Sequence, residues 1–218
     1  QELKVAFRIS LANTNEPFSI SAWLRKGELQ AAELTAADYS DKKFKEVLPK
    51  LKSLMANHPY DFFTQLQNIC LKAGVKVVHT PTLPKAPICG STRWLNDTPL
   101  IQLTGRYKRN DIFWFTFFHE AAHILLHGKK DVFLEKVDYS DKDKVKEEEA
   151  DEFACKWTLT EEQEQEILDA APLDEENIRA FAKKFVTHPA IIIGRLQHKR
   201  HIPFSLGREY FEQLIFEP

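Results

Sequence analysis

The sequence predicts an α+β protein that is mostly α-helical, with one small sheet in the middle of the chain. Apolar residues recur at helical spacing through the first third and again beyond Ser140, whereas the residues between 75 and 104 show the short apolar segments typical of strands. The 43% apolar fraction, with 16 Phe and 4 Trp, is enough for a packed core. A length of 218 residues favours one domain with a small appended lobe. We expect an N-terminal region of linker-like and packing helices over 1–74, and a core with C-terminal helices over 75–218.

The N-terminal region is expected to contain four helical segments, each with apolar residues at helical spacing. Ser40 can cap the third segment, and Pro49 predicts a bend within it. Gly74 stands at the position after the fourth segment that favours glycine. The predicted segments are 3–11, 17–35, 41–55 and 59–73.

The predicted strands of the central sheet are 75–79, 88–95 and 100–104. The last two are joined by the turn-forming run 96–99. A helix over 110–127, which Gly128 ends, and a strand over 131–137 follow. The order of elements therefore places the sheet between two helical regions.

The charge of the chain is nearly balanced but unevenly distributed. Its formal net charge of −2 lacks the positive field of a general nucleic-acid binder. Residues 131–176 hold 18 acidic and 5 basic side chains, whereas 183–208 hold six basic side chains and no acidic one. An anion-binding surface is therefore expected only near the C-terminus.

The cysteines indicate a reducing compartment. Cys70, Cys89 and Cys155 are odd in number and irregularly spaced, which argues against a disulfide framework and favours the cytoplasm. No apolar run approaches the roughly 18 residues of a membrane span, and the N-terminus lacks a signal-peptide pattern. Because the chain begins at Gln1, we expect a processed product or an excised fragment of a longer protein.

The most informative motif is His119-Glu120-Ala121-Ala122-His123, which matches HExxH. Two histidines four residues apart lie on one face of a helix and can bind one zinc ion, while the glutamate acts on a zinc-bound water. We therefore expect His119 and His123 to be zinc ligands and Glu120 to be the catalytic base.

The helix that carries this motif gathers its polar side chains on one side. At roughly 100° per residue, the polar residues, including Thr116 and His127, lie within about 100° of His119, and the rest of 112–126 is apolar. Buried unpaired polar groups cost several kcal/mol, and one metal ion would satisfy these together. The alternative is that backbone or carboxylate groups satisfy the histidines. We interpret His127, two turns from His119, as a core residue or a partner of a ligand.

A catalytic zinc site needs a third protein ligand and an open position. Glu147 shares a helical face with the small residue Ala150, which marks the side that approaches a neighbour, and is our choice of ligand. Asp151, one turn later, is placed to accept the free ring N–H of a ligating histidine. Glu148 and Glu149 turn outward, and we interpret them as solvated residues near a helix start.

Two other zinc patterns fit less well. The extended metzincin motif requires Gly at position 126 and His at position 129, where the chain has Leu126 and Lys129. A cysteine ligand, as in peptide deformylases, would implicate Cys89, but the other motifs of that family are absent.

The segments that carry a family resemblance are 113–127, Glu147-x-x-Ala150-Asp151-x-Phe153-Ala154, 90–95, 99–103 and 194–198. With them, the chain resembles the ImmA/IrrE family of metallopeptidases over roughly residues 75–203, which implies a zincin-like fold with an HExxH helix. Segment 7–33 is similar to the linker of members in which a helix-turn-helix domain precedes the peptidase. This chain would then be the C-terminal catalytic part of such a regulator. Residues 155–159 depart from the family pattern, which changes the adjoining substrate pocket.

The resemblance implies a zinc-dependent endopeptidase that cleaves a helix-turn-helix repressor or antitoxin-type protein. Zinc would lower the pKa of its water toward 7, and Glu120 would take the water proton and pass it to the leaving amine. We expect Zn²⁺ as the cofactor, a protein as the substrate and no membrane partner. The sequence assigns no oligomeric state.

Substrate-binding residues are less sharply indicated. The strand from Gly90 to Trp94 is a candidate edge on which an extended substrate could pair, although Trp94 is equally suited to the core. The side chains that could stabilise the oxyanion are Tyr107, His188 and His198. Each of these also suits a structural role, and His188 resembles a helix entry.

The basic segment 183–208 supports an alternative from another functional class. It contains two helical stretches separated by 186–189, as in a DNA-binding helix-turn-helix. The side chains that would face the groove are Arg195, Gln197, His198, Lys199 and Arg200. On this interpretation the protein is a DNA-binding or antitoxin-type regulator with a structural metal site. Apolar residues such as Ile192 suit packing against a peptidase body equally well, and we favour the peptidase.

Charge also predicts how a substrate would be selected. The acidic stretch 131–176 is the expected docking surface for a basic DNA-binding partner, with an attraction that salt weakens over about 8 to 10 Å. We expect cleavage at one exposed position of a regulator rather than many cuts in unfolded chains.

Overall fold

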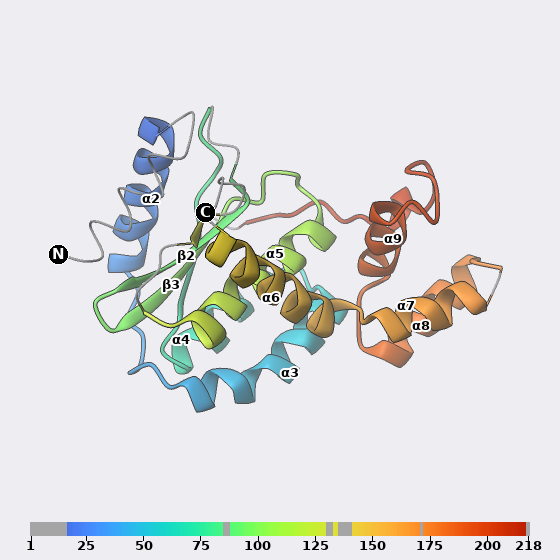
Figure 1. The fold of residues 1–218 in the computed structure, drawn as a ribbon, viewed down its shortest axis with the longest axis horizontal. Helices are drawn as coiled ribbons and strands as arrows, with labels where there is room; N and C mark the ends of the chain where they lie inside the picture. Colours follow the sequence, from blue (N-terminus) through green and yellow to red (C-terminus); the bar gives the residue numbers. More distant parts are fainter. Residues whose placement is uncertain (1–16, 85–87, 130–132, 135–140, 171, 217–218) are drawn as a thin grey trace.

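The computed structural model describes residues 17–84, 88–129, 133–134, 141–170 and 172–216 (Figure 1). This part is mainly helical with one small mixed sheet, which confirms the predicted fold class. The helices are α2 (Pro17–Ala32), α3 (Asp41–Asn57), α4 (Phe62–Lys72), α5 (Asn110–Ala122), α6 (Asp141–Thr158), α7 (Glu161–Asp169), α8 (Glu175–Phe185) and α9 (Pro189–His198). The strands are β1 (Lys76–His79), β2 (Gly90–Leu95), β3 (Thr98–Leu103) and β4 (Phe133–Leu134). The predicted segment 3–11 lies outside the described residues, as does most of the predicted strand 131–137.

The N-terminal helices begin and end where local chemistry dictates. The Ser40 hydroxyl accepts a hydrogen bond from the Lys43 N–H at 3.3 Å and caps α3, as predicted. Gly74, after α4, has a φ of +84°, and a Cβ there would stand 2.3 Å from the Tyr39 Cα. Only glycine fits this turn between the helices and the sheet.

The sheet has the order β1-β3-β2-β4. β2 and β3 form an antiparallel hairpin in which Pro99 pairs with Trp94, so the turn is shorter than predicted and Asn96 takes a φ of +56°. β1 pairs parallel to β3. The expectation that β2 forms an edge is wrong, because Ser91 pairs with Leu134 of β4 on its other side.

The two faces of the sheet carry different helices. Along β2, Thr92 contacts α5, whereas its neighbour Arg93 contacts α2, as strand alternation requires. The buried Arg93 guanidinium donates to the Leu24 carbonyl and to the Gln102 side chain, each at 2.7 Å, and Gln102 donates to the Trp23 carbonyl at 2.7 Å. α2 is thus held through its own main chain.

The core lies on the α5 face of the sheet. It takes large side chains from α3, α4, α5 and α9, among them Phe44, Leu66, Trp114, Phe117 and Ile192. Because these helices share one core, α5 is enclosed on nearly all sides. None of the described helices combines the length and apolarity that crossing a membrane requires.

Candidate metal centre

The polar side of α5 faces α6. His119 is 6% exposed and His123 is 1% exposed, and their Nε2 atoms lie 3.1 Å apart. The helix was predicted to run to residue 127, but its last turn, His123–His127, is a π-helix that ends at Gly128 with a φ of +76°. The distance between the two Nε2 atoms shows that the histidines share one side of the helix, as predicted.

α6 supplies a carboxylate to the same point. Glu147 Oε2 lies 3.2 Å from His119 Nε2, and Glu147 Oε1 lies 3.5 Å from His123 Nε2. Ala150 and Ala154 are fully buried on the same helix, in agreement with the predicted close face. These contacts join the three side chains that the sequence proposed as metal ligands.

The donor set fits a zinc ion. His119 Nδ1 lies 2.8 Å from Asp151 Oδ1, so this nitrogen donates and Nε2 presents its lone pair. Glu147 Oε1 is buried and has no hydrogen-bond partner among the described residues. Donors about 2.1 Å from a tetrahedral zinc stand about 3.4 Å apart. The distances of 3.1 to 3.5 Å match this value, and a bound cation would give the buried Glu147 Oε1 a partner.

The pKa values of the two histidines move apart. Burial acts to lower the pKa of His119, but hydrogen bonds with Asp151 and Glu147 outweigh it and raise that pKa to about 10. Burial, together with the neighbouring imidazoles His119 and His127, lowers the pKa of His123 to about 2. Without a metal the cluster holds one protonated ring beside its carboxylates. A bound cation would replace that positive charge.

Glu120 lies between the sheet and these histidines. Its side chain is 1% exposed, and the Thr92 hydroxyl lies 2.7 Å from its Oε2 and 2.9 Å from its backbone oxygen. A Cβ at Gly90 would stand 2.7 Å from Glu120 Oε1. Gly90 therefore leaves the space in which this carboxylate sits.

A family model described as the IrrE N-terminal-like domain, a peptidase family, matches residues 70–195. The chain belongs to this family. The match agrees with the resemblance seen in the motif residues, and it covers the sheet, α5, α6 and the start of α9. Among curated proteins, none matches the chain. Family membership supports a metallopeptidase type of function.

Trp94 and His188, two further residues predicted for the site, contact other parts of the fold. Trp94 is 5% exposed, packs against Tyr39 and donates its indole N–H to the Gly128 carbonyl at 3.1 Å. His188 caps α9 by accepting the Ala190 N–H at 3.1 Å. Both side chains thus have structural partners, and the contacts given for them lie outside the donor set.

Tyr107 and His198 are exposed. Tyr107 lines a pocket whose wall includes Cys89 and Thr116. Cys89 is buried, and among the described residues the cluster that could hold a metal contains no cysteine, so the deformylase-like alternative gains no support. His198 ends α9.

The contact between Glu149 and His127 was not predicted from the sequence. Glu149, which the sequence predicted to be solvated, has its Oε2 2.9 Å from His127 Nε2. His127 Nδ1 in turn lies 2.9 Å from His123 Nδ1. Glu149 is exposed, as predicted. The contact forms because the segment 123–127 packs against α6 beyond the end of α5. The four-residue spacing of His123 and His127 was the only signal in the sequence.

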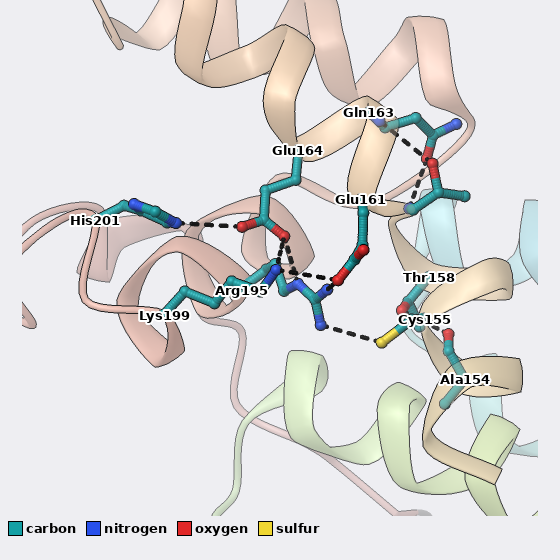
Figure 2. A network of polar contacts seen from close by, with 10 residues as sticks. Ala154, Cys155, Thr158, Glu161, Gln163, Glu164, Arg195, Lys199 and His201 are labelled. Atoms are coloured by element: carbon teal, nitrogen blue, oxygen red, sulfur yellow. Dashed lines mark hydrogen bonds and ion pairs between the residues drawn. The ribbon is translucent and has the colours of Figure 1, made fainter. Parts of the chain in front are cut away.

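The DNA-binding alternative loses residues that it needs. Figure 2 shows Arg195 directed between α6 and α7, where it donates to Glu164 at 2.7 Å and to Cys155 Sγ at 3.0 Å. Gln197 is 1% exposed and donates to the Leu206 carbonyl at 2.8 Å. Two of the side chains expected at a DNA groove are thus committed within the fold.

Proposed function

We propose that this family member is a zinc-dependent endopeptidase with Glu120 as its general base. The observation that carries the proposal is the convergence of His119, His123 and Glu147 within 4.8 Å beside a buried glutamate. His119 Nε2, His123 Nε2 and Glu147 would hold the zinc ion. When bound, zinc lowers the pKa of a water toward 7 and polarises a carbonyl group.

The protein's own groups carry the proton. We assign proton transfer to the Glu120 carboxylate, which the Thr92 hydroxyl orients by donating to its Oε2 at 2.7 Å. Glu120 would take a proton from the attacking water and give it to the leaving amine. Asp151 keeps the hydrogen of His119 on Nδ1, so that Nε2 remains a ligand atom.

The proposed substrate is a helix-turn-helix repressor or antitoxin-type protein, cut at an exposed linker. The support is the family resemblance together with the acidic segment 131–176, which suits a basic partner. β2 is an internal strand, so a substrate would not pair along it. Three free cysteines are consistent with the cytoplasm, where we place the protein.

The test uses Glu120→Gln, which retains the shape of the side chain. We expect this variant to bind zinc as the unaltered protein does, and to lose at least about 100-fold in peptidase activity. Metal analysis measures the first quantity, and mass spectrometry of a helix-turn-helix repressor incubated with each protein measures the second. Unchanged turnover would contradict the role of Glu120.

The same incubation tests the substrate. We expect one cut in the regulator, slower at higher ionic strength, and little cleavage of unfolded casein. Many cuts in unrelated chains would indicate a general protease, and a salt-dependent DNA shift by this chain would favour the DNA-binding alternative.

A further inference from the structure

The second metal-binding histidine of the proposed site has a partner that the mechanism above does not use. His127 is 3% exposed in its side chain and lies between two groups, with Nδ1 2.9 Å from His123 Nδ1 and Nε2 2.9 Å from Glu149 Oε2. These contacts form a line from Glu149 on α6 to the donor set. Like the contact of Asp151 with His119, the line ends on a carboxylate.

The hydrogens of this line can be assigned from its chemistry. A carboxylate accepts, so His127 Nε2 donates to Glu149, and a neutral His127 then presents a lone pair at Nδ1. That lone pair requires His123 to donate from its own Nδ1. The remaining nitrogen, His123 Nε2, is left with its lone pair toward His119 and Glu147.

The backbone places the three histidines in one row. His119, His123 and His127 are spaced by four residues, and their rings lie 4.8 Å and 5.0 Å apart between centroids. The second interval, His123–His127, is a π-turn. Gly128, with a φ of +76°, ends the turn directly after His127.

We propose that Glu149 and His127 are positioning residues, which act in sequence to hold His123 in the tautomer that binds metal through Nε2. This inference rests on the proposed zinc site. It differs from a general charge effect, because Glu149 acts only through His127. Removing a partner of a metal ligand typically lowers metal affinity by 10- to 100-fold.

The test measures the zinc affinity of the full chain by competition with a chelator. Glu149→Ala is compared with Glu148→Ala, an exposed neighbour of the same charge on the same helix. We expect Glu149→Ala to lower affinity by about 10-fold or more, and Glu148→Ala by less than about 3-fold. Equal losses in the two variants would overturn the proposal.

Variants at position 127 distinguish an effect of Glu149 that passes through His127 from a general effect of its charge. His127→Leu should lower affinity as Glu149→Ala does, and adding Glu149→Ala to it should cost nothing further. His127→Gln, which can both accept from His123 and donate to Glu149, should recover part of the affinity. If Glu149→Ala lowers zinc affinity equally in the His127→Leu background, the proposal that Glu149 acts through His127 is contradicted. Zinc binding absent from the unaltered protein would contradict the proposed function itself.

Discussion

Two carboxylates on successive helices, one buried and one partly buried, show what separates a structural cluster from a candidate metal site. Glu164 on α7 is 3% exposed and contacts Arg195, Lys199 and His201 at 2.7, 3.0 and 3.3 Å (Figure 2). Glu147 on α6 faces two imidazoles, and its Oε1 lacks a hydrogen bond within the described structure. Arg195 and Lys199 supply permanent positive charge to the first cluster, whereas the second has only imidazoles beside its carboxylate.

Electrostatics support the same distinction. Burial acts to raise the pKa of Glu164, but hydrogen bonds from Arg195 and Lys199 outweigh it and lower that pKa. In the other cluster, Asp151 and Glu147 face the two ring nitrogens of His119 and raise its pKa to about 10. The positive charge of the metal-free cluster is thus a proton, which a bound metal ion would replace. The charge of a carboxylate's partners therefore distinguishes a structural cluster from a candidate metal site.

The largest expected effect is the loss of zinc from Glu147→Ala. We expect its zinc affinity to fall by more than the roughly 100-fold attributed to partners of metal ligands, because a ligand itself is removed. In metal-free protein the same change should lower the unfolding temperature, since it removes the hydrogen bond that Glu147 Oε2 accepts from the protonated His119. Chelator competition and calorimetry measure the two quantities. A loss of affinity below about 10-fold would reject Glu147 as a ligand.

A smaller effect is expected from Asp151→Asn. Asparagine can still accept from His119 Nδ1 but lacks the charge of the carboxylate, so zinc affinity or activity should fall by about 10-fold to 100-fold. Glu152→Gln, an exposed change on the same helix, is the matched control. If both variants bind zinc alike, the contact of 2.8 Å between Asp151 and His119 has no role in the site.

The smallest effect, and one of a different kind, is expected from Glu164→Gln. Zinc affinity should not change, while the free energy of unfolding should fall by about 1–3 kcal/mol, because Arg195 and Lys199 lose the negative charge of their common acceptor. A carboxyl whose folded pKa is lowered stabilises the fold above its unfolded pKa of about 4.3, and the effect disappears as the pH falls through the folded pKa. Denaturant titrations at neutral and acidic pH measure this. A loss of zinc by this variant would show that the two clusters are coupled.

Local rules predicted the helix-borne part of the site. The arc of His119, Glu120 and His123 follows from helical geometry, and the face shared by Glu147, Ala150 and Asp151 indicated which acidic residue points inward. Each of these inferences uses the geometry of a single helix. The start of α3 after Ser40 and the glycine turn after α4 were predictable for the same reason, whereas α4 begins three residues later than predicted.

Contacts between elements distant in the chain were not predictable in this way. The internal position of β2 depends on where β4 returns to the sheet, and nothing near residues 90–95 encodes that order. The contact of Glu149 with His127 depends on the π-turn and on the packing of α6 beyond α5. A calculation of side-chain directions that treats each element as regular and isolated predicts neither the strand order nor this contact.

The anchoring of α2 has a consequence for engineering at this end of the protein. A Cβ at Gly27 would lie 2.0 Å from the Gln102 side chain, so this position must pass beneath Gln102 without a side chain. A shift of α2 by one turn would bring Trp23 or Ala31 there instead, and either would overlap Gln102. α2 therefore has one allowed register against the sheet. This register fixes the distance and rotation of its first residue, Pro17, relative to the sheet. A residue inserted between Pro17 and Gly27 would turn the helix start by roughly 100° rather than slide the helix along its groove.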